Sequence, residues 1–240
     1  INGTGNALAN NLAGNGAANT LDGGAGVDVM DGGAGDDTYY IDNINDVAAE
    51  SLSGAAGGLN DRVYSNVTHS LGNNIELLRL YGAGNINGTG NATANTIFAT
   101  DGDNVLDGAG GVDMASYSVA LAGVNVSLAS ITAQDTGGSG LDTLLNFENL
   151  MGSAFVDTLT GDANANTLQG LDGSDVLDGG AGNDRMIGGL GDDAYLVDST
   201  ADVIVELAGQ GVDQVSSSAS YTLAANVENL TLTGAAAING

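Results

Sequence analysis

GGAGVDVMDGGAGDDTYY, residues 23–40, and GLDGSDVLDGGAGNDRMIGGLGDDAYL, residues 170–196, decide the fold of this chain. Both divide into nine-residue blocks in one register, with glycine crowding positions one, two and four, Asp at position six and an apolar or aromatic residue at position eight. Glycine supplies the backbone freedom that a sharp turn requires. The three residues around position eight predict a short strand whose middle residue points inward. Each block is therefore expected to form one turn and one strand.

Two such blocks make one coil of eighteen residues, so turns eighteen residues apart are expected to stack on the same edge of the molecule. A nonapeptide repeat with this spacing predicts an all-β chain, a right-handed parallel β-roll or β-helix that binds calcium. Backbone carbonyls and Asp carboxylates of two stacked turns would surround a hard cation. Ca²⁺ accepts about six to eight oxygen ligands in flexible geometry, whereas Mg²⁺ demands a stricter octahedron. Several calcium ions are therefore the expected cofactors.

Three imperfect arrays of these blocks, at 5–40, 90–116 and 152–196, divide the chain. They predict three repeat units, 1–85, 86–157 and 158–240. Residues 41–81 are expected to form wider coils, with strands at 63–71 and 74–80. The excursion after the second array, 117–137, predicts a β-hairpin or edge strands packed on the roll through Val119, Val124, Val126, Leu128 and Ile131.

Position six is not always acidic, because several early blocks carry Asn there, as in Asn10, Asn19 and Asn166. Asn keeps an oxygen but lacks the charge, so these turns are expected to bind calcium more weakly or to be tied by amide hydrogen bonds. Adding eighteen to Asp28 and Asp184 gives Asp46 and Asp202, which are expected to close their stacks although the glycines have gone.

The composition agrees with a calcium-dependent fold. Three basic residues face 30 acidic ones among 240, a formal net charge of −27 at pH 7, with 40 Gly and no Pro, Cys or Trp. Such a surface does not attract nucleic acid, and no apolar run is long enough to span a membrane. Without cations the chain should repel itself, so metal binding and folding should be one event.

These nonapeptides strongly resemble the RTX, or haemolysin-type calcium-binding, repeat family, and the spacers TYYIDNINDVAAE and NVENLTLTGAAAING resemble the tandem regions of large secreted bacterial RTX proteins. In that family calcium lies between stacked turns, held by position-six Asp side chains and by backbone carbonyls near positions one to four. The acidic ligands expected from the repeat pattern and the resemblance are Asp28, Asp37, Asp46, Asp113, Asp142, Asp157, Asp175, Asp184, Asp193, Asp202 and Asp213. The expected turn glycines are Gly24, Gly26, Gly32, Gly33, Gly35, Gly173, Gly179, Gly180, Gly182 and Gly188.

Other acids and aromatic residues have simpler interpretations. Glu76, Glu148 and Glu228 recur in an Asn-x-Glu element, which favours a structural role or extra calcium ligands over glycoside chemistry. Tyr39 and Tyr195 end their arrays and are expected to cap the core. His69 is the only histidine, so no catalytic triad or histidine metal cluster is expected.

Alternatives to a calcium-bound solenoid are a disordered glycine-rich chain and a metal-free β-helix with solvated acidic turns. The chain begins at Ile1 without Met or a signal peptide. Its first three and last three residues are both Ile-Asn-Gly, so a second copy laid after the first would keep the repeat in register. These features predict one segment of a longer tandem array, stacked head to tail on neighbouring repeats or copies.

Three functions are compatible with the sequence. The favoured one is a non-enzymatic, calcium-stiffened segment of a long extracellular or cell-surface protein, such as an adhesin stalk, a surface-layer component or a filament. The family resemblance implies export in the unfolded state by a type I system and folding outside. The second is a noncatalytic module of a secreted enzyme or toxin. The third, a catalytic β-helix, is disfavoured by only three basic residues, Arg62, Arg79 and Arg185.

Overall fold

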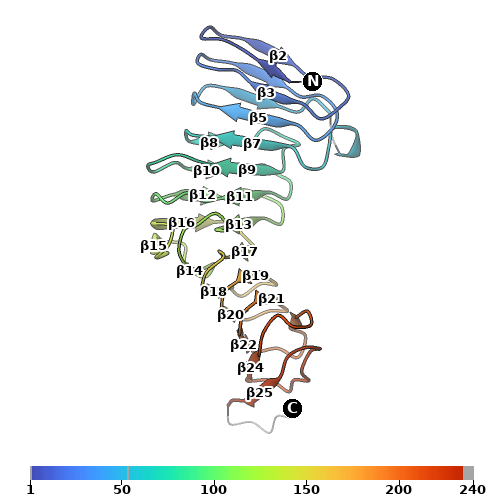
Figure 1. Cartoon of the computed structure of the whole chain (residues 1–240), viewed down its shortest axis with the longest axis vertical. Coiled ribbons are helices and arrows are strands. Elements are labelled where there is room, and N and C mark those ends of the chain that lie inside the picture. The colour runs from blue at the N-terminus through green and yellow to red at the C-terminus, as the bar shows by residue number, and fades with distance from the viewer. Residues whose placement is uncertain (1, 53, 235–240) are drawn as a thin grey trace. The chain divides into compact units, whose positions relative to one another are not determined.

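A computed structural model describes residues 2–52 and 54–234, and nearly all of the regular structure is short β-strand (Figure 1). The chain forms two compact units, residues 1–114 and 115–240. In each unit the strands stack in parallel as a β-solenoid, which confirms the predicted fold class. The three repeat units 1–85, 86–157 and 158–240 remain a prediction from the sequence.

The first unit is built from three sheets of parallel strands. One face carries β1 (Gly3–Thr4), β3 (Thr20–Asp22), β5 (Thr38–Ile41), β7 (Arg62–Ser65), β9 (Leu77–Leu80) and β11 (Thr96–Phe98). The other faces carry β2 (Asn11–Ala13), β4 (Val29–Asp31) and β6 (Val47–Ala49), then β8 (His69–Ser70), β10 (Gly88–Thr89) and β12 (Val105–Asp107). A 3₁₀ turn, η1 (Gly54–Ala56), interrupts the widest coil, and β13 (Met114–Ser116) begins at the end of the unit.

The second unit repeats this arrangement on two main faces. One carries β14 (Asn125–Ser127), β18 (Thr158–Thr160), β20 (Val176–Asp178), β22 (Ala194–Val197), β24 (Gln214–Ser217) and β25 (Asn229–Leu232). The other carries β17 (Asn149–Met151), β19 (Thr167–Asp172), β21 (Arg185–Leu190) and β23 (Val203–Val205). The remaining strands, β15 (Gln134–Asp135) and β16 (Leu141–Leu145), pair with each other as an antiparallel hairpin.

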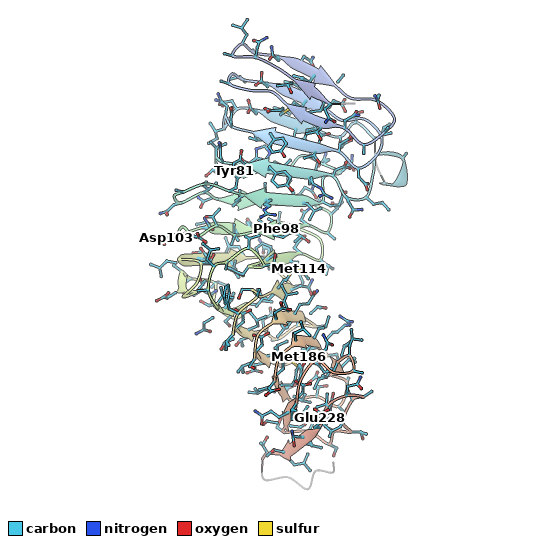
Figure 2. The ribbon with its side chains drawn as sticks, in the orientation of Figure 1. Tyr81, Phe98, Asp103, Met114, Met186 and Glu228 are labelled. Carbon is cyan, nitrogen blue, oxygen red and sulfur yellow. The ribbon has the colours of Figure 1, made fainter. Side chains whose placement is uncertain are left out.

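The strand register confirms the eighteen-residue coil. Thr20 pairs with Thr38, and Val176 pairs with Ala194. Position-eight residues therefore stack one above another inside the solenoid. Figure 2 shows the side chains, and its labelled Met186 is fully buried between the strands of the second unit. The buried position-eight side chains are Leu21, Met30, Tyr39, Ile97, Leu106, Ala115, Leu159, Leu168, Leu177, Met186 and Tyr195.

The coils after the first array differ from the prediction in two ways. Thr38 pairs with Arg62, a wide coil of 24 residues, but Arg62 pairs with Leu77, a narrow coil of only 15. The expected strand at 63–71 is also wrong, because it breaks into β7 and β8, which pair with different sheets. The break follows from Ser65, whose buried hydroxyl donates to the carbonyl of Val67 (2.7 Å) and turns the chain.

An antiparallel hairpin is present, but β15 and β16 form it, so only its first strand lies within the predicted excursion 117–137. β14 instead joins the parallel stack beside β18, with Val126 fully buried. The expected packing of Ile131 on the roll is wrong, because its side chain is 74 % exposed. No helix in the described residues has the length and apolar character needed to cross a membrane. The matching triplet at 238–240 lies outside the described residues.

Candidate metal sites at the stacked turns

Position-six side chains form ladders along each edge of the solenoid. The backbone amide of Asn166 donates to Oδ1 of Asp184 (2.8 Å), and the amide of Asp184 donates to Oδ1 of Asp202 (3.0 Å). The same contact joins Asp28 to Asp46 (2.9 Å). Further rungs join Asn10 to Asp28, Asn19 to Asp37, Asn95 to Asp113, Asp157 to Asp175, Asp175 to Asp193 and Asp193 to Asp213. The predicted stacks are therefore present, including those closed by Asp46 and Asp202.

The turns fall into two kinds, which differ in the amide at position two. In the first kind this amide donates to the position-six side chain of its own turn, as Asp162 does to Asn166 Oδ1 (2.8 Å). We call these the closed turns: 5–10, 14–19, 90–95, 99–104, 152–157 and 161–166. In several of them the Asn amide nitrogen also donates to a carbonyl of another coil, as Asn166 does to Glu148 (2.8 Å). The predicted amide ties are therefore present.

In the second kind the residue at position two has positive φ, so its amide turns away from the position-six carboxylate. The φ angles are +72° at Gly24, +97° at Gly33, +86° at Leu171, +76° at Gly180 and +113° at Gly189. We call these the open turns: 23–28, 32–37, 170–175, 179–184 and 188–193. In each one Oδ2 of the position-six Asp is buried and has no hydrogen-bond partner among the described residues, at Asp28, Asp37, Asp175, Asp184 and Asp193.

In two of the open turns the position-two amide has another acceptor. The amide of Gly24 donates to Oδ1 of Asp22 (3.0 Å), and that of Gly180 donates to Oδ1 of Asp178 (3.1 Å). Both acceptors are the last residues of the preceding block, so the position-nine acid holds the turn backbone away from position six. Buried polar atoms in proteins nearly always have a partner, and a bound cation would supply one to each of these five carboxylate oxygens.

Glycine at position one leaves room for that cation. A Cβ at Gly23, Gly32, Gly170, Gly179 or Gly188 would collide with Oδ2 of the position-six Asp in the same turn. At Gly170 it would also lie 2.7 Å from the carbonyl oxygen of Gly188, one coil on. The space is thus lined by carboxylate and carbonyl oxygens, the hard ligands that calcium takes in flexible geometry. The residues present fit a calcium ion.

Burial disfavours the ionised form of the carboxylates in the open turns. Burial raises the pKa of Asp175 and Asp193 to about 7 and that of Asp184 to about 6, although each carboxylate accepts a backbone amide that lowers it. Burial also raises the pKa of Asp37. A buried carboxylate is stable as an anion only with a compensating charge or hydrogen bonds, so these turns take either protons or a cation.

The other predicted ligands do not share this environment. Asp157 lies in a closed turn, where Oδ2 accepts the amide of Ser153. Asp46 and Asp202 end their ladders with both oxygens accepting backbone amides. Asp142 lies in strand β16 opposite Gln134 and contacts Tyr117. Asp157, Asp46 and Asp202 therefore hold the backbone of their turns.

Asp113 and Asp213 also belong to the ladders. Asp113 is fully buried, and position two of its turn, Ala109, has a φ of +69°, the backbone of an open turn. Asp213 accepts the amide of Asp193 (2.8 Å), and its own amide donates to Glu228 Oε2 (2.8 Å). Glu76 accepts the amide of Asp61 in the same way (2.9 Å). Glu76 and Glu228 therefore continue the ladders, as expected for structural residues.

The sequence reasoning missed three acids, Asp61, Glu50 and Glu206. Asp61 accepts the amide of Asp37 (2.6 Å), and its Oδ2 is buried without a partner in the described residues. Glu50 and Glu206 each end a repeated spacer, YYIDNINDVAAE and YLVDSTADVIVE, and each stands eighteen residues after a position-one glycine. That recurrence was the signal that could have found them.

The hydroxyls of Tyr39 and Tyr195 lie beside these glutamates. Both rings are fully buried, as expected for core caps, but their hydroxyls donate to Glu50 and Glu206. The amide of Gly32 donates to the Tyr39 hydroxyl (2.8 Å). His69 is buried in strand β8, and burial lowers the pKa of its imidazole.

The comparisons with known proteins agree with this geometry. The model of the RTX calcium-binding nonapeptide repeat, in four copies, matches residues 4–39, 89–115 and 160–195. These stretches cover the first two arrays, and all but the first block of the third, except for the last residue of each array. All five open turns fall inside them, whereas the closed turn 152–157 falls outside. A search of curated proteins found no match to the chain.

Proposed function

This chain is built on RTX calcium-binding nonapeptide repeats, and from that premise we propose that it is a calcium-dependent structural segment of a long secreted bacterial protein. The observation that carries the proposal is the set of five orphaned Asp oxygens, one in each open turn. The segment serves as a stiff stalk or filament element and carries out no reaction of its own.

Calcium binds first to the open turns, because their carboxylates lack internal partners. Asp28, Asp37, Asp175, Asp184 and Asp193 are the principal side-chain ligands, and the carbonyls of the stacked glycine turns complete the shell. The closed turns need no ion, since their position-six oxygens already accept an amide. They act as spacers that keep the strands stacked between ion sites.

Folding is coupled to calcium because the free chain is strongly self-repelling, with a net charge of −27. Each ion would cancel two charges and satisfy buried oxygens at the same step. Sites of the weak extracellular class, roughly 10⁻⁴ to 10⁻³ M, stay empty at cytosolic calcium. The chain would leave the cell unfolded, fold outside, and thereby resist sliding back.

Further coils can add at the ends of the described stacks. Within the described residues, β1 pairs only with β3, and β25 pairs only with β24, so each has one free edge. Unpaired parallel edges are templates for another strand. We therefore place flanking repeats, or a second copy of this chain, head to tail on these edges. Sedimentation of the chain in calcium as a strict monomer at every concentration would contradict self-association.

Calorimetric calcium titration with parallel far-UV circular dichroism tests the proposal. The full chain should change cooperatively from coil to β-structure as several ions bind. Asp184→Asn, in an open turn, should lower the number of ions bound by one, whereas the matched Asp157→Asn, in a closed turn, should leave the number unchanged. A chain that is equally folded in chelator and binds no calcium would overturn the proposal.

A further inference from the structure

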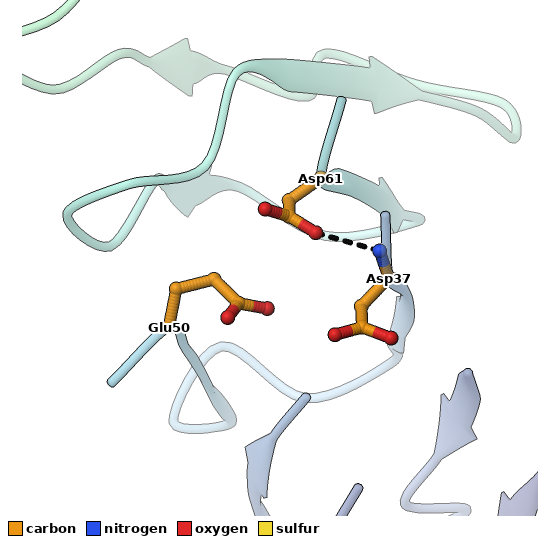
Figure 3. A group of neighbouring side chains, drawn as sticks. All are labelled: Asp37, Glu50 and Asp61. Atoms are coloured by element: carbon orange, nitrogen blue, oxygen red, sulfur yellow. Dashed lines mark hydrogen bonds between the residues drawn. The ribbon is translucent and has the colours of Figure 1, made fainter. Parts of the chain in front are cut away.

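The two outer arrays end in carboxylate clusters that differ from every other turn. At the end of the first array, Asp37, Glu50 and Asp61 each place a carboxylate oxygen within 4.8 Å of the other two. Figure 3 shows the three carboxylates converging from three separate segments, with the hydrogen bond from the Asp37 amide to Asp61. The third array ends in the same way, with Asp193, Glu206 and Asp213.

The glutamates enter these clusters at position one, which is glycine in every nonapeptide block except 99–107. Glu50 directly follows β6, just as Gly32 directly follows β4, and the strands pair with an offset of eighteen residues. Glu206 follows β23, eighteen residues after Gly188, and β23 pairs with β21 at the same offset. In a nonapeptide turn position one contributes only backbone to the space beside the Asp. Here it contributes a carboxylate.

The added carboxylates are buried and have unused oxygens. Glu50 is 7 % exposed and Glu206 is 6 % exposed, while Asp37 and Asp61 are fully buried. One oxygen of Glu50 receives the Tyr39 hydroxyl, but Oε2 has no partner among the described residues, and neither has Oδ2 of Asp37 or Asp61. Oε2 of Glu206 and Oδ2 of Asp193 are in the same state in the second cluster.

The protein offers these clusters little positive charge. The whole chain has only three basic residues, Arg62, Arg79 and Arg185. Burying like charges together is strongly unfavourable unless a cation or protons join them. The separation of the oxygens, within 4.8 Å, suits one ion between them, since calcium–oxygen distances are about 2.3 to 2.6 Å.

We propose that Asp37–Glu50–Asp61 and Asp193–Glu206–Asp213 are a second class of calcium site, one at the end of each outer array, each held by three carboxylates. We call them the array-end sites. They rest on the proposed calcium function and extend it. Because an array-end site offers the ion three carboxylates, where a turn with one Asp offers one, it binds calcium more strongly than that turn, and it takes a trivalent lanthanide more strongly still.

The array-end sites also have a distinct structural task. Beyond Asp37 the coil widens to 24 residues, and beyond Asp193 it widens to 20. A wide coil can slip in register more easily than a nonapeptide pair. One ion bound by carboxylates from both sides of the wide coil, with Glu50 or Glu206 from within it, fixes the last regular turn to the next coil.

Calcium titration of the full chain against Glu50→Gln/Glu206→Gln tests this inference. The matched control is Asp36→Asn/Asp192→Asn, which removes the same two charges from exposed side chains in the same two turns. Wild type and control should both show two ions of highest affinity. The glutamine variant should lose that class, with affinity at least tenfold weaker, and keep the weaker ions of the other open turns.

The outcomes separate the two proposals. If wild type binds calcium but the glutamine variant matches the control in number and affinity, the array-end sites are wrong and the proposed function stands. If wild type binds no calcium, both fail. If the glutamine variant does not fold in saturating calcium, a Tb³⁺ titration of the wild-type chain tests the inference instead. Tyrosine-sensitised emission should then saturate at two ions per chain and vanish in Tyr39→Phe/Tyr195→Phe; persistence in that variant overturns the inference.

Discussion

Turns 161–166 and 179–184 lie on the same edge of the solenoid, one coil apart, and yet differ in whether the position-six side chain has all its oxygens hydrogen-bonded. In the first, Asp162 donates its amide to Asn166 Oδ1 (2.8 Å), so the turn is satisfied by its own backbone. In the second, Gly180 has a φ of +76°, and Oδ2 of Asp184 is left buried without a partner in the described residues. The orphaned oxygen, and with it the proposed ion site, therefore depends on position two together with position six.

Asp157 shows that the acid alone does not open a turn. It carries the position-six carboxylate, but Ser153 at position two donates its amide to Oδ2, and the turn is closed. Leu171 shows the converse, because it adopts a φ of +86° although it is not glycine, and its turn is open. Positive φ at position two correlates with the orphaned oxygen in both cases.

The largest effect should follow from pH in the absence of calcium. The carboxyls of Asp184, Asp175 and Glu50 have pKa values of about 6, 7 and 8 in the folded chain, raised mainly by burial, against about 4 when unfolded. Protonation therefore favours the fold. This stability is complete below about pH 4 and is lost as pH rises through about 6 to 8.

Circular dichroism melts in chelator at a series of pH values measure this loss. The chain should be β-structured near pH 4 and largely unfolded near pH 8, and millimolar calcium should restore the fold at pH 8. Stability in chelator that increases from pH 4 to pH 8 would contradict the assignment of the open turns.

Closing an open turn by mutation should have the next largest effect. Gly180→Val places a β-branched residue at positive φ, which costs roughly 1–3 kcal/mol, and removes one ion, worth about 2.7 kcal/mol at a hundredfold excess of calcium over its Kd. The matched control is Asp162→Val, the same new residue at position two of the stacked closed turn. Thermal melts in calcium should show a much lower Tm for Gly180→Val only. An equal decrease in Tm for both variants would contradict the difference between open and closed turns.

Opening a closed turn should add an ion. Asp162→Gly/Asn166→Asp converts turn 161–166 to the open sequence pattern and keeps the net charge of the chain. Calorimetry should find one more bound calcium than in wild type. Asn166→Asp alone should add none, because the amide of Asp162 still reaches position six. A gain of an ion in the single variant would mean that the acid decides occupancy without position two.

The smallest effect concerns backbone strain at Leu171. Leu171→Gly keeps the open turn and relieves positive φ at a non-glycine residue, a gain of about 1 kcal/mol in unfolding free energy. For a chain of this size that raises Tm by about 2–4 °C. Leu8→Gly, at an exposed residue of a closed turn, is the control and should lower stability by about 0.5–1 kcal/mol. An equal change in both would remove strain as the explanation.

The periodic parts of the fold could be predicted because one rule repeats. Each block fixes a turn by glycine and an inward residue at position eight, and the register of β19 with β21 or β3 with β5 follows from the eighteen-residue period. The position-six stacks followed from the same arithmetic. Where the period failed, as in the coil that ends at Arg62, coil length depended on long-range pairing that no local pattern encodes.

Whether each turn is open or closed was harder to predict from the sequence. The acids at position six were identified, but Asp157 and Asp184 look alike until the amide of position two is placed. Ala109 and Leu171 adopt positive φ against their local preference, so composition at position two would have misjudged both. Glu50 was missed for a different reason: it occupies a glycine position by register while lying in a spacer that has lost the repeat.

Anomalous diffraction from crystals grown in calcium tests most directly the claim that position-two geometry selects the ion sites. A peak is expected at each open turn and none at the closed turns, including 152–157 with its Asp157. Peaks at 152–157 and 161–166 as strong as that at 179–184 would contradict it, because occupancy would then be independent of the amide at position two.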